Sequence, residues 1–115
     1  MGKPVKKQAT GVSQAKESDI QLSICDYLAA KRHFFWRQNT APLFREGRFF
    51  AMPKYSKVGV PDIIVIFNGK FIGLEVKRPN GKPSVGQKEF ESDCIKAGGA
   101  YHLVCSIDDV IKIGL

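Results

Sequence analysis

The sequence predicts one small α/β domain in which helices pack on a mixed β-sheet. Three features predict it: a hairpin with two apolar strands, helical segments on both sides of it, and a final short strand. With 115 residues, 43% of them apolar, the chain can form one hydrophobic core but not two. Its longest apolar run, residues 63–67, is too short to cross a bilayer, and no signal-peptide segment follows the start.

Residues 1–15 mix Lys, Gly, Pro and Ser without apolar periodicity, which predicts a flexible basic arm ahead of one folded domain at 16–115. A helix is expected from Glu17 or Ser18 to about residues 31–33. Its core-facing stripe recurs at helical spacing and consists of Ile20, Ile24, Tyr27 and Leu28. Glu17 lies at the edge of this stripe, where an acid either favours the helix dipole or belongs to a site.

The aromatic segment at residues 34–39 predicts a strand, and residues 41–60 predict a long irregular link with one possible short strand at 48–52. Basic residues and aromatics alternate in this link, a pattern that suits a nucleic-acid backbone and its bases. Each aromatic fits equally well a side chain packed beneath the loop. These aromatics are Phe44, Phe49, Phe50 and Tyr55.

Asn68-Gly69, between two apolar runs at residues 62–67 and 70–77, predicts a hairpin with a type I′ turn. This turn places Asp62 opposite Glu75, with Cβ atoms ~4.5–5.5 Å apart on one face. Lys77 returns to the same face two residues later. One strand face carries Ile63, Val65, Phe67, Ile72 and Leu74, and the other carries Ile64, Ile66 and Phe71. Strands apolar on both faces belong at the centre of a sheet.

Ser84 and Gln87 have the form of a capping box, which predicts a helix from there to about residue 97, where Gly98 follows. Its inward residues are expected to be Phe90, Cys94 and Ala97. A last strand is predicted at 101–105, and Ser106 is expected to cap a closing helix at 107–113. The order is helix, strand, hairpin, helix, strand, helix.

Paired carboxylates favour a hard cation such as Mg²⁺ or Mn²⁺, which activates water and stabilises charge on a phosphate. A nearby lysine can orient that water or neutralise developing charge. The alternative is that Glu75 and Lys77 form an ordinary polar strand end. The apolar strands around them, and Asp62 in register, favour the site. No nucleophilic triad or glycine-rich phosphate loop competes, and His33 and His102 are isolated.

The net charge of +7 is concentrated in two segments. Residues 1–16 hold four lysines and no acid, and residues 31–61 hold seven basic residues against Glu46 alone. This clustering favours a polyanion, with nucleic acid first, over a merely solvated basic surface. Three widely spaced cysteines indicate buried thiols in a reducing, intracellular compartment.

Several short motifs resemble one family over about residues 17–113. They are Glu17-Ser18-Asp19-Ile20-Gln21, Trp36-Arg37-Gln38-Asn39, Gly59-x-x-Asp62, Glu75-Val76-Lys77-Arg78, Ser84-x-x-Gln87 with Phe90, and Gly98-Gly99-Ala100. With them the chain is similar to the VRR-NUC (virus-type replication-repair nuclease) family of the PD-(D/E)XK superfamily, in its stand-alone phage or bacterial form. The resemblance implies a restriction-endonuclease-like α-β-β-β-α-β core with a mixed central sheet.

The resemblance also implies roles for particular residues. The expected metal ligands, for Mg²⁺ or Mn²⁺, are Asp62, Glu75, the backbone carbonyl of Val76, and Glu17. Lys77 would be the catalytic lysine. Gln87 would lie beside the site and orient it or contact DNA, or else serve only the capping box. The residues expected to contact DNA are Arg37, Arg45, Arg48, Lys54, Lys57 and Arg78.

The function expected from this resemblance is that of a metal-dependent DNA endonuclease in DNA repair. The chain resembles stand-alone members of the family, which would imply a homodimer that cuts branched DNA such as four-way (Holliday) junctions. The location would be the cytoplasm of a bacterial or phage-infected cell, with no membrane partner and no cofactor beyond the metal. The alternatives are the same chemistry on linear, flap or single-stranded DNA, and a non-catalytic DNA-binding module with a nuclease-like fold.

Overall fold

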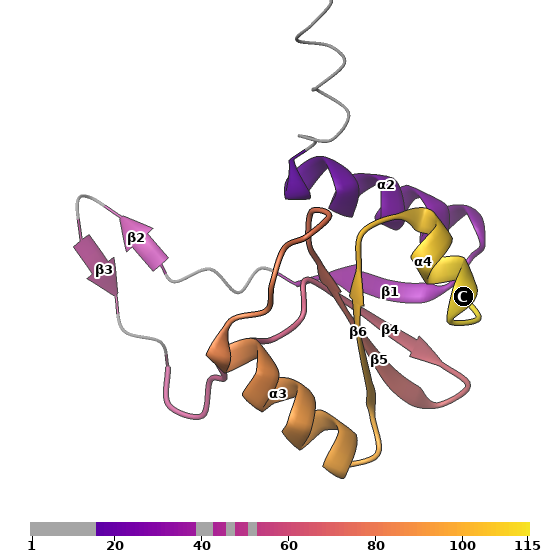
Figure 1. Ribbon diagram of the computed structural model, residues 1–115. Helices are drawn as coiled ribbons and strands as arrows, with labels where there is room; N and C mark the ends of the chain where they lie inside the picture. Colours follow the sequence, from indigo (N-terminus) through magenta and orange to yellow (C-terminus); the bar gives the residue numbers. More distant parts are fainter. Residues whose placement is uncertain (1–15, 39–42, 46–47, 51–52) are drawn as a thin grey trace, which may run out of the picture.

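A computed structural model describes residues 16–38, 43–45, 48–50 and 53–115, with side chains for 16–38 and 53–115. The predicted arm at 1–15 lies outside the described residues. Figure 1 shows the order of the elements. They are α2 (Glu17–Ala30), β1 (Phe34–Arg37), β2 (Leu43–Arg45), β3 (Arg48–Phe50), β4 (Ile63–Phe67), β5 (Lys70–Val76), α3 (Val85–Lys96), β6 (Ala100–Val104) and α4 (Ile107–Lys112).

The main sheet has four strands in the order β1-β4-β5-β6. The first three are antiparallel to their neighbours, and β6 runs parallel to β5. Parallel neighbours need a crossover connection, and α3 provides it between β5 and β6. The predicted α-β-β-β-α-β core with a mixed sheet is therefore confirmed.

The hairpin has the predicted register, because Phe67 pairs with Lys70 and Ile63 with Leu74. Asn68 has a φ of 52° and Gly69 a φ of 78°. A type I′ turn needs positive φ at both central residues, and Asn and Gly tolerate it best. The local sequence of the turn thus fixes the register of the two central strands.

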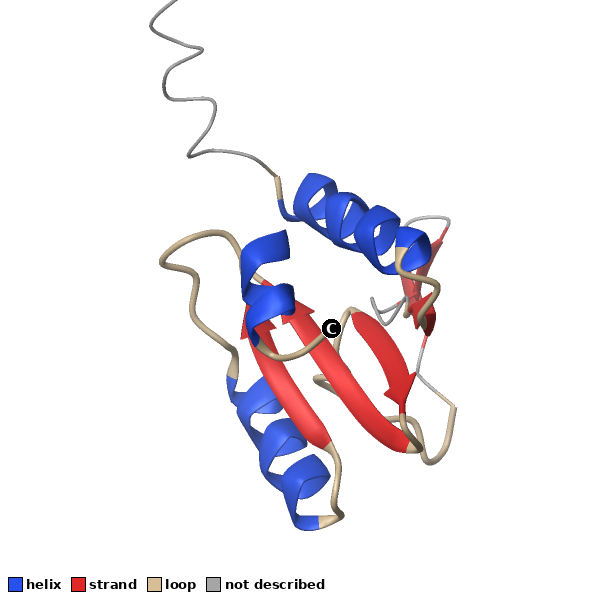
Figure 2. Ribbon diagram, turned by 90° about the vertical axis from the view of Figure 1, so that its right-hand side faces the viewer, coloured by secondary structure: helices blue, strands red, loops and turns tan. Residues whose placement is uncertain are grey.

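Helices cover both faces of the central strands. Figure 2 shows α4 in front of the sheet, α3 behind it and α2 across its upper end. The core lies on the side of α2 and α4, and its fully buried members are Ile24, Leu28, Ile63, Val65, Leu74, Val76 and Val110. On the opposite side, Phe90 of α3 packs against Tyr101 of β6, with ring centroids 5.8 Å apart. The central strands are buried on both faces, as their apolar pattern predicts.

The structure differs from expectation by a residue or so at the ends of α2, β6 and α4, and more clearly in three places. The link contains a two-stranded sheet, β2 with β3, where one possible strand at 48–52 was expected. This pair stands away from the main sheet in Figure 1. The strand β1 ends at Arg37, two residues early, although Gln38 N–H still bonds to the Asp62 carbonyl at 2.7 Å. Ala97 is exposed because α3 ends one residue before it, while Phe90 and Cys94 are half-buried as predicted.

The three cysteines, all within the described residues, are free thiols. Among the helices of the described chain, none combines the length and the apolar character that a membrane span requires.

Leu28→Ala should lower the free energy of unfolding by about 2–5 kcal/mol, because Leu28 is fully buried in the core under α2. Leu22→Ala is the matched control, since Leu22 lies on the same helix and is 52% exposed. It should change stability by less than about 0.5 kcal/mol. Urea unfolding of the two variants would measure both effects, and equal losses would contradict the assignment of the core face.

Candidate active site

Asp62 and Glu75 lie at the open end of the central hairpin. Beyond the last pair, Ile63 with Leu74, the same register sets Asp62 opposite Glu75. The main-chain carbonyl of Asp62 accepts from Gln38 of the neighbouring strand segment, so it faces away from β5. Asp62 and Glu75 therefore form a non-hydrogen-bonded pair of the antiparallel ladder. In such a pair the two side chains lie closer together than in a hydrogen-bonded pair. The predicted juxtaposition of the two carboxyl groups is thus present in the structure.

Pro61 shapes the ladder beside this pair. In the same register Pro61 stands opposite Val76, and proline has no N–H to give to the Val76 carbonyl. The Val76 N–H instead donates to Asp62 Oδ2 at 2.8 Å. Both main-chain groups of a strand residue in a hydrogen-bonded position face the same neighbour. The Val76 carbonyl therefore faces the Asp62 carboxylate and receives no hydrogen bond from residue 61. A backbone carbonyl in this position could serve as a metal ligand.

The Glu75 carboxylate is buried and incompletely compensated. It is 3% exposed; Oε2 accepts from Gln87 Nε2 at 2.7 Å, and Lys77 Nζ lies 3.8 Å from the same oxygen. Its Oε1 has no hydrogen-bond partner among the described residues. Burial first, and then the charge of Asp62, raise the pKa of Glu75 to about 8, although Lys77 opposes the shift. A cation or a hydrogen-bond donor next to Glu75 Oε1 would complete the environment of this carboxyl group.

Asp62 is affected by the same environment. Burial is the largest cause that raises its pKa, and the hydrogen bond from Val76 opposes it. The buried Glu75, the half-buried Asp62 and the Val76 carbonyl, which has no donor from Pro61, form an all-oxygen donor set of the kind that hard divalent cations prefer. The residues present therefore fit a Mg²⁺ or Mn²⁺ ion.

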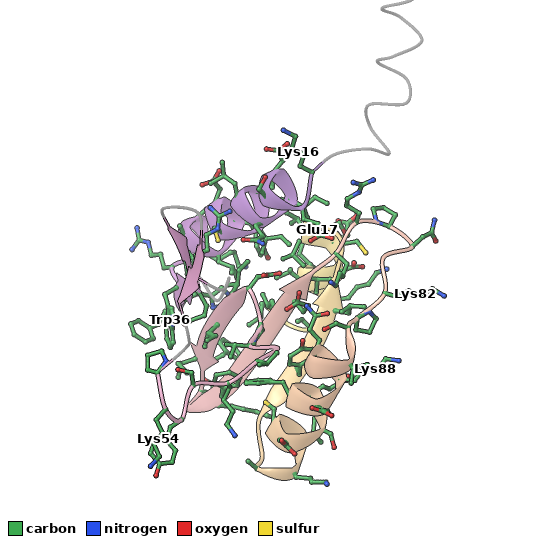
Figure 3. All side chains as sticks on the ribbon, turned by 90° about the vertical axis from the view of Figure 1, so that its left-hand side faces the viewer. Lys16, Glu17, Trp36, Lys54, Lys82 and Lys88 are labelled. Carbon is green, nitrogen blue, oxygen red and sulfur yellow. The ribbon has the colours of Figure 1, made fainter. Side chains whose placement is uncertain are left out.

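Glu17 begins α2 and faces the same region. Its charge contributes to the raised pKa of both Asp62 and Glu75, so it lies within electrostatic reach of the pair. Figure 3 shows it where α2 begins, beside the loop that leads to α3. Across the described ranges, however, no three Asp, Glu, His or Cys side chains converge closely enough to hold one metal ion. A ligand role for Glu17 stays a prediction.

Gln87 combines the two roles that the sequence left open. Its Oε1 accepts from the Ser84 N–H at 2.8 Å and its own N–H donates to Ser84 Oγ, so the capping box is complete. Because Oε1 is occupied by a donor, Nε2 is the group that faces Glu75. The start of α3 thus positions an amide donor on a buried carboxylate.

Gln87→Leu should weaken metal binding, and metal-dependent activity with it, about 10–100-fold, because residues that orient a ligand carboxylate typically carry effects of this size. Ser84→Ala is the matched control, since it removes the capping oxygen but leaves the donor to Glu75 in place. Titration of the divalent cation against each variant would compare them. An equal loss in both variants would assign the effect of Gln87 to the helix cap alone.

The predicted DNA-contacting residues whose side chains the structure describes have different surroundings. Arg37 Nε donates to Gln21 of α2 at 2.9 Å, Lys54 lies 5.2 Å from the ring centre of Tyr55, and Arg78 is exposed in the turn after β5. Lys57 lines a pocket against α3. The side chains of Arg45 and Arg48 lie outside the described residues. Three lysines that sequence reasoning missed lie across the site from Lys54 in Figure 3, namely Lys16, Lys82 and Lys88.

Tyr101 is a further residue that the sequence did not reveal. Tyr101 lies on β6, pairs with Gly73 of β5 and is 6% exposed. Its hydroxyl has no hydrogen-bond partner among the described residues. Burial, then the charge of Glu75, raises the pKa of this hydroxyl. The parallel register of β6 decides this placement, and no local motif signals such a register.

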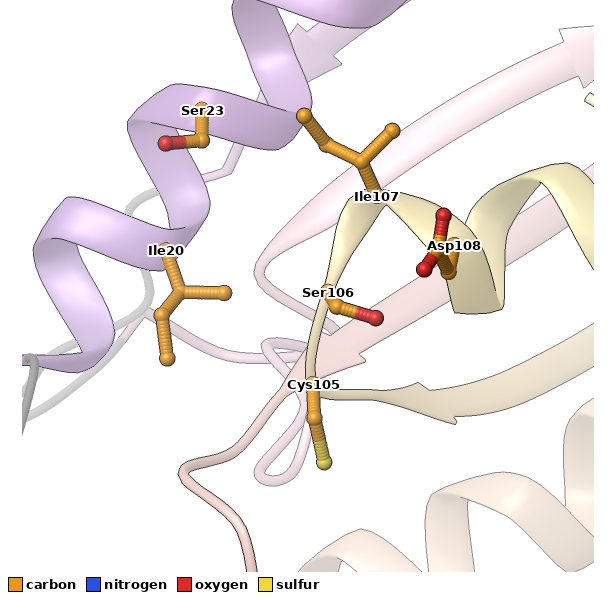
Figure 4. Close-up of a pocket in the computed structure, with 6 residues that line it drawn as sticks. All are labelled: Ile20, Ser23, Cys105, Ser106, Ile107 and Asp108. Carbon is orange, nitrogen blue, oxygen red and sulfur yellow. The ribbon is translucent and has the colours of Figure 1, made fainter. Parts of the chain in front are cut away.

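Figure 4 shows a pocket between α2 and the turn that leads from β6 into α4, with a volume of about 330 Å³. It is lined by Ile20, Ser23, Cys105, Ser106, Ile107 and Asp108. None of the hairpin residues contributes to this lining, and neither does a basic side chain. A polyanion has no counter-charge there, so the site lies at the hairpin.

Comparisons with known proteins agree with this geometry. No family profile matches the sequence, and neither does any curated protein. Among solved structures, one described as a VRR_NUC domain is 26% identical, with 84% of this chain and 91% of that chain covered and a TM-score of 0.59. A second, described as a VRR_NUC domain protein, shares the fold at 21% identity, with 85% and 84% covered and a TM-score of 0.55. The chain thus has the fold of a VRR-NUC domain, with a restriction-endonuclease-like core, in agreement with the resemblance of its sequence motifs.

Proposed function

We propose that this VRR-NUC domain is a Mg²⁺- or Mn²⁺-dependent DNA endonuclease that hydrolyses phosphodiester bonds. One observation carries the proposal: the buried carboxyl group of Glu75, with one oxygen lacking a donor in the described chain, lies with the half-buried Asp62 beside a lysine at the open end of the hairpin. Placing a second acid beside a buried, incompletely hydrogen-bonded Glu75 costs free energy that a purely structural hairpin would avoid.

Asp62, Glu75 and the carbonyl of Val76 would hold the cation, and Glu17 would complete the site from α2. When bound, such an ion lowers the pKa of its water and stabilises charge on the phosphate. Burial and the charge of Asp62 raise the pKa of Glu75 and so favour its protonated form, and a bound cation would displace that proton. Gln87 then keeps the carboxylate in place through Nε2.

Lys77 supplies positive charge at the reacting phosphate. Its ammonium lies 3.8 Å from Glu75 Oε2 and its side chain is 16% exposed, so it is tethered and still open to a substrate. An ammonium in such a position orients a nucleophilic water by hydrogen bonding and offsets the negative charge that develops during attack. The exposed Lys16, Arg78, Lys82 and Lys88 add a basic border for the DNA backbone.

The preferred substrate in this proposal is branched DNA such as a four-way junction, cut by a homodimer. Two symmetric sites match the two symmetric nicks that such a junction needs. The alternative with the same chemistry is a nuclease for linear, flap or single-stranded DNA. A non-catalytic DNA-binding module is the alternative from a different class, and the intact set of Asp62, Glu75 and Lys77 argues against it.

A panel of labelled linear, flap and four-way-junction DNAs, incubated with Mg²⁺, Mn²⁺ or EDTA, tests these readings together. We expect cleavage with either cation, none in EDTA, and the fastest cutting on the junction. Faster cutting of flap or linear DNA would overturn the branched-DNA preference. Salt-sensitive binding with no cleavage in either cation would overturn the enzyme itself. Light scattering in the same buffer would distinguish a monomer from a dimer.

A further inference from the structure

Two exposed aromatic side chains lie on the sheet face that carries the carboxylates. Phe34 pairs with Ile66 and Trp36 with Ile64, and paired residues share a face. Asp62 is two residues beyond Ile64, so its side chain belongs to that face as well. Phe34 is 68% exposed and Trp36 is 41% exposed.

The helix on this face leaves the aromatic pair uncovered. In Figure 3, α3 lies over the side of β6, while Trp36 lies at the opposite edge of the sheet. Phe35, on the other face of the same strand, packs against the core. Leaving two large rings in water on one face of a strand forgoes about 1.5–3 kcal/mol for each ring that burial would have gained. Such a pair therefore suggests a ligand.

Hydrogen bonds through Gln38 connect the indole of Trp36 to Asp62. Its Nε1 donates to Gln38 Oε1 at 2.8 Å, and Gln38 N–H donates to the Asp62 carbonyl at 2.7 Å. Trp36 and Gln38 are two strand residues apart, or about 7 Å. Gln38 lies opposite Asp62 on the adjacent strand, about 4.8 Å away, so a base on the indole lies within a few nucleotides of a phosphate at the carboxylates.

The second ring defines the shape of the platform. Phe34 meets Trp36 edge to face, with ring centroids 6.0 Å apart and planes inclined by 63°. Phe34 thus borders the indole, and part of the Trp36 side chain stays exposed to solvent. A basic side chain also lies near the platform, since the exposed Lys54 lies below Trp36 in Figure 3. Exposed aromatics with basic neighbours are the combination that binds single-stranded nucleic acid.

We propose that Trp36, bordered by Phe34, is a stacking platform for an unpaired base of the DNA substrate close to the scissile phosphate. This inference rests on the proposed function and adds a substrate class to it. A base inside an intact duplex has both faces covered by its neighbours and cannot stack on the indole. The platform therefore selects DNA with unpaired nucleotides next to the cut, as at the opened branch point of a junction.

Trp36 is the sole tryptophan of the chain, so intrinsic fluorescence reports directly on the platform. The protein would be titrated in EDTA, which prevents cleavage, with a single strand, a forked duplex and a blunt duplex of equal length. Fluorescence should be quenched by the single strand and the fork and should change little with the blunt duplex. Anisotropy of labelled DNA would show binding in every case.

Variants separate stacking from folding. Trp36→Leu should weaken binding to the single strand and the fork about tenfold or more, as expected for the loss of one stacked base, and should leave the blunt duplex unchanged. Trp36→Phe should restore most of the loss. Phe34→Ala keeps the fluorescent reporter and should reduce the quenching. Ile111→Ala, which removes an exposed apolar side chain from α4, should have no effect. Circular dichroism would check that each variant is folded.

Equal quenching by blunt duplex and single strand would overturn the proposal. So would DNA binding without any fluorescence change, or unchanged affinities in Trp36→Leu. Fluorescence that changes with protein concentration alone would assign the platform to a second copy of the chain instead. All these readouts are taken without a divalent cation. The two proposals can therefore fail separately. If only the nuclease proposal failed, cleavage would be absent while the stacking signal persisted.

Discussion

Glu75→Gln should reduce DNA cleavage about 10³-fold or more while DNA binding is retained. The substitution keeps the shape of the side chain, and the amide oxygen can still accept from Gln87 Nε2. It removes the negative charge that would hold the cation, and with it the electrostatic stabilisation that metal-dependent phosphoryl chemistry needs. Single-turnover cleavage and DNA anisotropy on the same preparation would separate the two effects.

The matched control is Glu89→Gln, which neutralises an exposed glutamate on α3 and should cut at the wild-type rate. Asp62→Asn should behave as Glu75→Gln does, because Asp62 lies across the hairpin from it. Cleavage within a few fold of wild type for Glu75→Gln would contradict the metal site as built here.

The same substitution should change the pH dependence of stability in EDTA. Between pH 4.5 and about 8 the folded protein keeps a proton on Glu75 that the unfolded chain has released. The free energy of unfolding therefore falls as pH rises through this window, by at most about 1.4 kcal/mol per pH unit from this group. Glu75→Gln should flatten the fall and be the more stable protein at pH 8. Thermal unfolding across the window would measure the difference.

Lys77→Met should also reduce cleavage about 10²–10³-fold, because it removes the ammonium near Glu75 that would face the reacting phosphate. Its effect on metal binding should differ from that of Glu75→Gln. Loss of the lysine leaves both carboxylates in place with less nearby positive charge, so the cation should bind at least as well. Cleavage rates at saturating Mn²⁺, combined with a cation titration, would reveal this pattern.

Lys70→Met is the control for Lys77→Met, since Lys70 lies on the same strand, at its exposed end beside the turn. It should leave cleavage unchanged. Lys77→Arg keeps the charge but changes the shape of the donor group, and should recover only part of the rate. Undiminished cleavage by Lys77→Met would remove the lysine from the mechanism.

Local sequence determines a large part of this fold. Asn68 and Gly69 favour one turn type, and that turn sets the pairing of Asp62 with Glu75 without reference to the rest of the chain. The periodic stripe that includes Ile24 and Leu28 identifies the buried side of α2 in the same way. Ser84 and Gln87 mark the start of α3 because capping involves residues only three positions apart. Each of these features depends on neighbours in sequence.

The properties that make the hairpin end a chemical site depend on contacts between distant segments. The start of α3 brings Gln87 onto Glu75, and burial raises the pKa of that carboxyl group. The pairing of β1 with β4 sets Trp36 on the sheet face that carries the carboxylates, and the parallel register of β6 sets Tyr101 under α3. Sequence alone determined which acids face each other across the turn. The tertiary structure decided how deeply they are buried and what surrounds them, because desolvation and long-range packing arise only when separate elements meet.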